Sequence, residues 1–310
     1  MNILKSTIEH AIVTGASGFI GRALVHNLVA KGVEVIAVDR SPFLENICHS
    51  VLLDITKPNA LDHLIKSNTV IFHMAAKASV PKSVASPMGD FHDTCYGFLQ
   101  VLESARKKNC KVIFPSTASI FDINCELPLT EKSYVKPSSP YGAAKVSGEA
   151  YCFAYHKCYK TDVRIARMFS VYGLGMNRFV IHDIIRKIQK NSKELVLLGD
   201  GEQIRDYLYI DDILNGLEII ACNGVPGEDY NLASGQSVRI IDLARTIASL
   251  MGVPDIKISL TGEAFPGDVP KWYGDISKIQ SIGFKQNISL SEGLKKTIKW
   301  LESNTIGETI

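Results

Sequence analysis

Short apolar runs alternate with longer amphipathic segments through the first half of the chain. The apolar runs predict strands, and the amphipathic segments predict helices. The predicted strands span 10–14, 34–39, 51–53, 69–73, 111–115 and 162–168, and the predicted helices span 18–31, 90–108 and 140–159. Because strands and helices alternate, we expect an α/β fold with a Rossmann-like, doubly wound parallel sheet and helices on both of its faces.

The pattern changes after Phe169, where Gly, Asp and Pro become frequent and the apolar runs shorten. Helices are predicted over 179–189, 210–222, 238–251 and 290–301. The sequence contains no internal repeat, low-complexity segment or clear linker. We therefore expect one domain over 1–168 with a returning segment near 207–235, and a smaller, interwoven C-terminal α/β lobe over 169–206 and 236–310.

Three glycines follow the first predicted strand directly. Gly15, Gly18 and Gly21 stand three residues apart in the segment TGASGFIG. The first permits a tight turn, the second lets the backbone approach a pyrophosphate, and the third lets helix and strand pack closely. A phosphate can then bind the free N–H groups at the positive end of the helix. The spacing predicts a dinucleotide site, in which we include Phe19 and Ile20.

Two acidic residues extend this predicted site. Asp39 ends the second predicted strand, where a carboxylate can accept both ribose hydroxyls of a dinucleotide. Its charge repels a 2′-phosphate and favours NAD over NADP, although the adjacent Arg40 could bind that phosphate instead. Asp54 follows the third predicted strand. It is either a solvated turn carboxylate or a hydrogen-bond partner of adenine, together with the backbone of Ile55.

A Tyr-Gly-Ala-Ala-Lys segment carries candidate chemistry. Positions four apart on a helix share a face, so the Tyr141 phenol and the Lys145 ammonium are predicted to lie side by side. Ser139 can cap this helix, and Pro140 suits its first turn. The ammonium, together with a positive nicotinamide ring, would favour the phenolate, so that Tyr141 could act as a base.

A hydroxyl partner precedes that helix. Thr117 falls just past the carboxyl end of the fifth predicted strand, and ligands of open α/β sheets bind along that edge. It could hydrogen-bond the reacting oxygen of a substrate. Ser116 and Ser119 are rival hydroxyls for this role.

With these motifs the chain resembles the extended short-chain dehydrogenase/reductase family, particularly its nucleotide-sugar 4-epimerases. The resemblance runs from about Glu9 to Trp300. The matching positions are 14–21, Asp39, 54–56, 73–76, Val80, Pro87, 116–117, 120–121, 141–145, 167–173, 199–207, 211–212 and 266–268.

The resemblance implies NAD as the cofactor, a nucleotide-diphosphate sugar as the substrate, and a role for each matching residue. Tyr141 would be the base, Lys145 would bind the nicotinamide ribose, and Thr117 would bind the sugar oxygen. Arg205 would hold the substrate diphosphate, a task that suits a guanidinium fork. Further implied cofactor contacts are Ala75, Ala76, Lys77 and Thr94. Further implied substrate contacts are Val80, Ser170, Asn177, Arg178 and Asp268.

Three positions depart from the family pattern. Ser170 and Thr94 stand where these epimerases usually carry Asn, and Phe265 stands where they usually carry Arg before Pro-Gly-Asp. Ser170 and Phe265 fall on the diphosphate clamp, so the nucleotide or its binding pose could differ from that of UDP-galactose enzymes. Arg178 could supply the missing positive charge.

The reaction expected from the resemblance is inversion of a sugar carbon, C4, through a transient 4-keto sugar. Dehydratases of this family follow the active-site Thr with Asp-Glu, whereas Thr117 is followed by Ala-Ser, so 4,6-dehydration is not expected. A ketosugar reductase, a 5,6-dehydratase or a decarboxylase remains an alternative on the same scaffold. A non-catalytic dinucleotide-sensing protein is the alternative of another class.

Composition narrows the remaining possibilities. The formal net charge of +2 gives no reason to expect a nucleic-acid or membrane partner. The seven cysteines include no CxxC pair and are expected to be reduced thiols of a cytoplasmic protein. The eight histidines form no HxH or HxxxH set, so no metal is expected. The resemblance implies a homodimer through helices 90–108 and 141–159, although their apolar residues fit equally well against the sheet.

Overall fold

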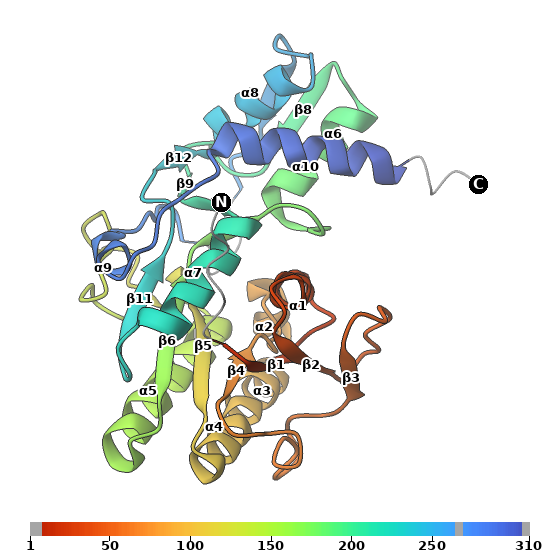
Figure 1. The fold of residues 1–310 in the computed structure, drawn as a ribbon. Helices are drawn as coiled ribbons and strands as arrows, with labels where there is room; N and C mark the ends of the chain where they lie inside the picture. Colours follow the sequence, from red (N-terminus) through yellow and green to blue (C-terminus); the bar gives the residue numbers. More distant parts are fainter. Residues whose placement is uncertain (1–7, 264–268, 306–310) are drawn as a thin grey trace.

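A seven-stranded parallel sheet forms the centre of the computed structural model, which describes residues 8–263 and 269–305 (Figure 1). Its strands are β1 (His10–Thr14), β2 (Glu34–Asp39), β3 (His49–Leu52), β4 (Thr69–His73), β5 (Lys111–Thr117), β6 (Val163–Met168) and β11 (Asp229–Leu232). They are arranged in the order β11-β6-β5-β4-β1-β2-β3, with every neighbouring pair parallel. This is the doubly wound Rossmann order, so the predicted fold class is confirmed.

Helices cover both faces of the sheet. On one face α1 (Phe19–Ala30) contacts α7 (Ile210–Asn223), and on the other α4 (Gly97–Lys108) contacts α5 (Pro140–Tyr159) (Figure 1). Successive side chains of a strand point to opposite faces, so Ile12 and Val13 enter different apolar clusters. Because both faces are covered, central strands are apolar almost throughout, and all of β4 is buried.

The segment before α4 differs from its prediction as part of a helix over 90–108. Two short helices, α2 (Val80–Ala85) and α3 (Pro87–Asp90), come first, and a π-helical segment, η1 (Phe91–Tyr96), leads into α4. Pro87 begins α3 at a position where the missing N–H is tolerated. Apolar spacing does not distinguish a π turn from an α turn, so the pattern could not predict η1.

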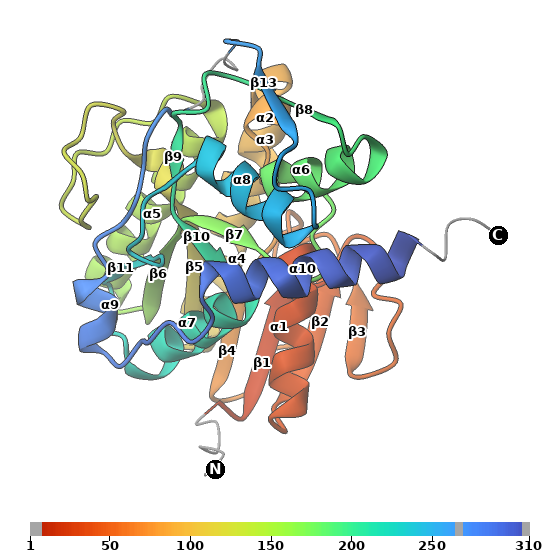
Figure 2. The ribbon, with the colours of Figure 1, turned by 90° about the horizontal axis from the view of Figure 1, so that it is seen from above.

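The second half builds a lobe beside the sheet. Its helices are α6 (Phe179–Lys190), α8 (Ile240–Leu250), α9 (Ser277–Ser281) and α10 (Leu290–Thr305). Three strand pairs accompany them: β7 (Ser170–Tyr172) with β10 (Tyr207–Tyr209), β8 (Glu194–Leu197) with β13 (Lys257–Leu260), and β9 (Ile204–Arg205) with β12 (Val238–Arg239). Figures 1 and 2 show α6, α8 and β8 together at one end of the molecule. The helix predicted from 238 begins two residues later, because 238–239 form β12.

A buried carboxylate joins the lobe to the sheet. Asp206 accepts hydrogen bonds from the backbone N–H groups of Ser234 at 2.7 Å, Gly235 at 3.0 Å and Gly274 at 3.2 Å. Ser234 and Gly235 follow β11, and Gly274 lies between β13 and α9, so this side chain links its own segment to two distant ones. Among the described residues, no helix has the length and apolar character needed to cross a membrane.

Candidate active site

The glycine loop between β1 and α1 packs too closely for larger residues. Gly15 has φ of +68°, and a Cβ there would lie 2.5 Å from the backbone N of Ala75. A Cβ on Gly21 would lie 2.1 Å from the carbonyl oxygen of Gly15. Gly18 caps α1 without a side-chain hydrogen bond, so no side chain competes for the first N–H groups of the helix. This cradle fits the pyrophosphate of a dinucleotide.

The rim of the cradle carries charged residues from β2 and η1. Asp39 accepts hydrogen bonds from the N–H groups of Ser17 and Ser41, each at 2.9 Å. Arg40 donates to Oδ2 of Asp93 at 3.0 Å, and the Lys77 ammonium lies 2.7 Å from the same oxygen. Burial raises the pKa of Asp93, but contacts with Lys77, His92 and Arg40 outweigh it and lower the pKa to about 2. The sequence pattern did not single out Asp93.

The other residues of the predicted cofactor site occupy the sheet edge nearby. Asp54 accepts from the N–H and the hydroxyl of Thr56, at 3.0 and 2.8 Å, and these bonds lower its pKa. Asp54 is thus a turn-capping carboxylate in this structure, and Ile55 beside it is buried. Ala75 donates its N–H to the Thr14 hydroxyl at 3.4 Å, with Ala76 next in the chain. Thr94 is 1% exposed.

Helix α5 is fixed at its start and in its middle. The Ser139 hydroxyl accepts a hydrogen bond from the N–H of Gly142 at 3.2 Å, with Pro140 in the first turn, as predicted. The Arg167 guanidinium donates to both carboxylate oxygens of Glu149, at 3.0 and 2.7 Å. This buried bidentate pair ties α5 to β6 and so sets the position of the helix that carries Tyr141.

The Tyr141 side chain lies near the side chain of Thr117, and the N–H of Tyr141 donates to the Ser83 hydroxyl at 3.1 Å. Burial raises the pKa of Tyr141 to about 12, and the nearby Thr117 hydroxyl opposes that rise. That Lys145 and a bound nicotinamide ring together favour the phenolate stays a prediction, because in the protein alone desolvation of the phenolate dominates. Of the rival hydroxyls, Ser116 is buried, and Ser119 donates its N–H to Thr117 Oγ1 at 3.2 Å.

Lys145 is 3% exposed, and its Nζ donates to the carbonyl oxygen of Pro115 at 2.7 Å. Nζ also lies 4.9 Å from the centroid of the Phe114 ring. Burial lowers the pKa of Lys145 to about 8, with Asp90 as the strongest opposing charge. Asp90 is itself 2% exposed, and burial raises its pKa. The sequence pattern did not identify Asp90 either.

The predicted substrate residues Arg205 and Arg178 lie in the second half of the chain. Arg205, in β9, donates to the carbonyl oxygens of Ile204 at 2.9 Å and Pro270 at 3.2 Å, and lies 4.3 Å over the Trp272 ring. Arg178 is exposed before α6, and its charge lowers the pKa of Tyr141. The structure therefore brings Arg178 within electrostatic reach of Tyr141.

The remaining predicted substrate residues are spread around this region. Ser170 begins β7 and donates its N–H to the carbonyl oxygen of Asp206 at 2.9 Å. Asn177 is exposed beside Arg178, and Val80 begins α2. Asp268 and Phe265 lie outside the described residues.

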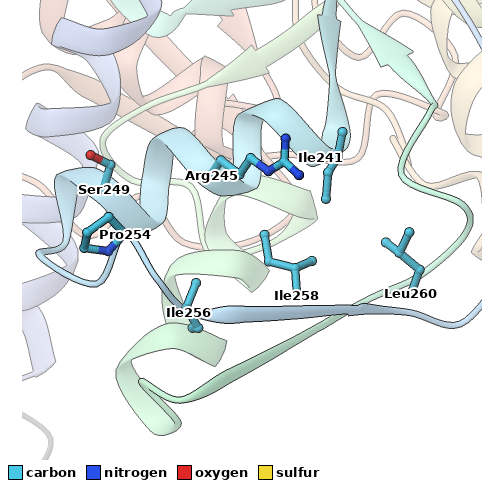
Figure 3. Close-up of a pocket in the computed structure, with 7 residues that line it drawn as sticks. All are labelled: Ile241, Arg245, Ser249, Pro254, Ile256, Ile258 and Leu260. Carbon is cyan, nitrogen blue, oxygen red and sulfur yellow. The ribbon is translucent and has the colours of Figure 1, made fainter.

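A groove of about 570 Å³ lies elsewhere, between α8 and β13 (Figure 3). It is lined by Ile241, Arg245, Ser249, Pro254, Ile256, Ile258 and Leu260. None of the predicted site residues lines it, and its wall is mostly aliphatic. We therefore locate the candidate active site at the sheet edge and not in this groove. Within 8–263 and 269–305, no group of three or more His, Cys, Asp or Glu side chains could hold a metal ion.

Known proteins resemble this chain over nearly its whole length. Residues 11–233 match the model of the NAD dependent epimerase/dehydratase family. A putative UDP-glucose 4-epimerase from Methanocaldococcus jannaschii is 32% identical over 311 residues, which cover 94% of this chain and 98% of that protein.

Solved structures agree with the sequence comparison. A UDP-N-acetylglucosamine 4-epimerase from Methanobrevibacter ruminantium, in complex with UDP-N-acetylmuramic acid, has a TM-score of 0.87 at 30% identity, covering 96% of this chain and 99% of that one. A dTDP-glucose 4,6-dehydratase from Streptomyces venezuelae, with NAD bound, has a TM-score of 0.87 at 25% identity, covering 96% and 98%. Proteins named for two different reactions, epimerisation and dehydration, therefore resemble this chain.

Proposed function

Because the chain belongs to the NAD dependent epimerase/dehydratase family, we propose that it is an epimerase that inverts C4 of a nucleotide-diphosphate sugar through a transient 4-keto sugar. One observation carries the proposal. Tyr141 and Lys145 lie one turn apart on α5, and Thr117, at the carboxyl end of β5, lies near the Tyr141 phenol. This is the arrangement expected for proton transfer at a sugar hydroxyl beside a dinucleotide.

The chain's own residues would hold the cofactor. Gly15, Gly18 and Gly21 would admit the pyrophosphate, and Asp39 at the end of β2 would bind the adenosine ribose, which supports NAD over NADP. Lys145 would bind the ribose next to the reacting ring. When bound, NAD supplies the acceptor, and later the donor, of a hydride.

The catalytic residues divide the remaining tasks. Tyr141 would take the proton of the C4 hydroxyl and later return it, while Thr117 would hold the same oxygen. The protein alone keeps the phenol protonated, since burial raises the pKa of Tyr141 to about 12. Positive charge must therefore favour the phenolate. Arg178 supplies such a charge within the chain, and Lys145 and the bound nicotinamide ring would add to it.

The protein would bind the substrate mainly through the diphosphate of the substrate. Arg205 lies on the second lobe, with Trp272 beneath its guanidinium. Holding the nucleotide firmly and the sugar weakly would let the 4-keto ring present either face to the cofactor. We also propose that 169–206 and 236–310 form the substrate lobe, and that 1–168 with 207–235 forms the cofactor domain.

The proposal is tested by incubating the purified protein with UDP-, GDP-, dTDP- and CDP-sugars and following the products by NMR. We expect one sugar to convert to its C4 epimer without net change in absorbance at 340 nm, because the cofactor is regenerated in each cycle. Stoichiometric consumption of reduced cofactor would indicate a ketosugar reductase, and release of carbon dioxide or water would indicate a decarboxylase or a dehydratase. Any of these outcomes would contradict the epimerase.

We propose further that the protein is a homodimer through α5 and the segment around η1. Large apolar side chains are exposed on these neighbouring elements, among them Met88 and Phe91 on one and Tyr151 and Phe153 on the other. Phe98 and Leu102 are instead buried against the sheet. Analytical ultracentrifugation should find a dimer, and Phe153→Glu should weaken it. Tyr134→Glu, an exposed aromatic on a distant loop, should not.

A further inference from the structure

Asp93 binds two cations with one oxygen atom. Its Oδ2 lies 3.0 Å from a guanidinium nitrogen of Arg40 and 2.7 Å from Nζ of Lys77. Arg40 follows β2, Lys77 follows β4, and Asp93 lies in the π-helical segment η1. One carboxylate thus links three elements at the edge of the sheet where the glycine loop lies.

Arg40 matters because it directly follows Asp39, the last residue of β2. In Rossmann folds a carboxylate at the end of the second strand binds the ribose 2′-hydroxyl of NAD, whereas a nearby arginine accommodates the 2′-phosphate of NADP. This chain carries both residue types, Asp39 and Arg40, side by side. The sequence therefore leaves the choice of dinucleotide open, and the decision depends on what holds the arginine.

The formal charges of the four residues around the expected ribose position sum to zero. Asp39 and Asp93 carry two negative charges, and Arg40 and Lys77 carry two positive charges. Asp93 remains ionised at neutral pH, because its contacts lower its pKa to about 2. A 2′-phosphate would have to displace the Asp93 carboxylate from both cations and then lie beside two carboxylates. The ribose hydroxyl of NAD is neutral, so it need not displace Asp93 and is not repelled by the two carboxylates.

We propose that Asp93 is a specificity-determining residue, which excludes NADP by holding Arg40 and Lys77 away from the 2′ position of the adenosine ribose. This inference rests on the proposed dinucleotide site and adds a residue that neither the glycine motif nor the strand-end carboxylate includes. The side chain of Asp93 is 16% exposed, whereas that of Arg40 is 57% exposed. The carboxylate is thus the fixed member of the pair, and the arginine is the movable one.

The experiment measures binding and needs no sugar substrate. Purified protein, freed of bound nucleotide, is incubated with an equimolar mixture of NAD and NADP. The dinucleotides retained after gel filtration are then quantified by mass spectrometry. We expect the wild type to retain NAD in excess. Asp93→Asn should raise the ratio of NADP to NAD by about tenfold, because the 2′-phosphate no longer competes with a carboxylate for Arg40 and Lys77.

Two further variants connect the change to Arg40. Arg40→Gln combined with Asp93→Asn should return the ratio toward the wild-type value, because the released arginine is gone. Arg40→Gln alone should change the ratio little, because Asp93 already occupies that arginine. Glu34→Gln is the matched control: it neutralises a carboxylate paired with Lys66 at the opposite end of β2 and should leave the ratio unchanged.

Several results would overturn the inference. An unchanged ratio in a folded Asp93→Asn variant would remove the role of Asp93. A sharp loss of NADP in Arg40→Gln alone, which does not depend on how Asp93→Asn folds, would mean that Arg40 already serves the phosphate. Equal retention of NAD and NADP by the wild type would also contradict it. Failure of the proposed function looks different, since the wild type would then retain no dinucleotide or convert no sugar.

Discussion

The two sides of the candidate site are built in different ways. On the cofactor side the backbone sets the geometry, through a glycine loop, a carboxylate at a strand end and a helix capped by Ser139. On the proposed substrate side the candidate residues are long side chains on a short strand and a loop, Arg205 in β9 and Arg178 before α6. Backbone geometry follows from local spacing, whereas the reach of a guanidinium depends on tertiary neighbours such as Trp272.

The two sides also differ in what holds their cations. Arg40 and Lys77 both bind the Asp93 carboxylate, so the two cations at the rim of the glycine cradle share one anionic partner. The described contacts of Arg205 include two backbone carbonyls and the face of Trp272, which orient its planar guanidinium. A planar guanidinium fork suits a diphosphate.

The largest effect should come from the residue that lies between the two sides. Tyr141→Phe keeps the ring and removes the phenol oxygen near Thr117. Loss of a general base lowers turnover by about 10²–10⁴-fold, so we expect a fall in kcat within that range. Retention of the dinucleotide should change little, because the glycine cradle is untouched. Activity within tenfold of wild type would remove Tyr141 as the base.

A glycine substitution should break the cofactor side alone. Gly15→Ala introduces a Cβ that would lie 2.5 Å from the backbone N of Ala75, at φ of +68°. We expect about 100-fold weaker retention of dinucleotide, since the cradle must shift by a large part of an ångström. Gly32→Ala is the matched control, because Gly32 has φ of +79° with nothing within 4 Å. It should cost about 1 kcal/mol of stability and leave dinucleotide binding intact.

The sequence was sufficient for the parts of the molecule that depend on local spacing. The apolar runs placed β1, β2 and β4 at the bounds that the structure shows, and the Ser139 cap of α5 was predicted and confirmed. Parallel order then follows from the alternation of strands and helices. Thr117 ends β5, and Tyr141 lies in the first turn of α5, the next long helix, so both lie at the carboxyl edge of the sheet.

Other features depend on contacts that spacing does not encode. The π-helical segment η1 carries Asp93, and no period in the sequence distinguishes it from an α-helix. Asp90 is buried near Lys145 because α3 packs on α5, a contact between segments far apart in the chain. Burial raises the pKa of Tyr141 and outweighs the positive charge of Arg178, and neither effect can be read from the spacing of residues. A perturbed buried group is thus a tertiary property.

The substrate side should respond more weakly, and in KM. Arg205→Ala should raise the KM of the sugar nucleotide by about 10–100-fold with a small change in kcat, as expected for loss of charge-assisted bonds to a diphosphate. Arg178→Ala should raise KM by about tenfold if Arg178 supplies the second positive charge. Arg245→Ala, in the groove of Figure 3, is the control and should leave KM unchanged. An unchanged KM in Arg178→Ala would remove Arg178 from the clamp.

The smallest effect should be a shift in the pH dependence of kcat. It would arise from Lys145 and Asp90, two buried charged residues near Tyr141. Burial lowers the pKa of Lys145 to about 8, so activity that needs its ammonium should fall as the pH rises above about 8. Asp90 opposes that lowering, whereas Glu149 and Cys152 contribute less. Asp90→Asn should therefore move the alkaline limb of kcat to lower pH. The charge of Asp90 also raises the pKa of Tyr141, so its removal should lower that pKa as well. Near pH 8.5 we expect the variant to be about threefold less active relative to its own optimum than the wild type.

Asp90→Glu is the control for this prediction, because it keeps the charge and should keep the pH profile. A loss of kcat at every pH without movement of the alkaline limb would mean that Asp90 only supports packing between α3 and α5.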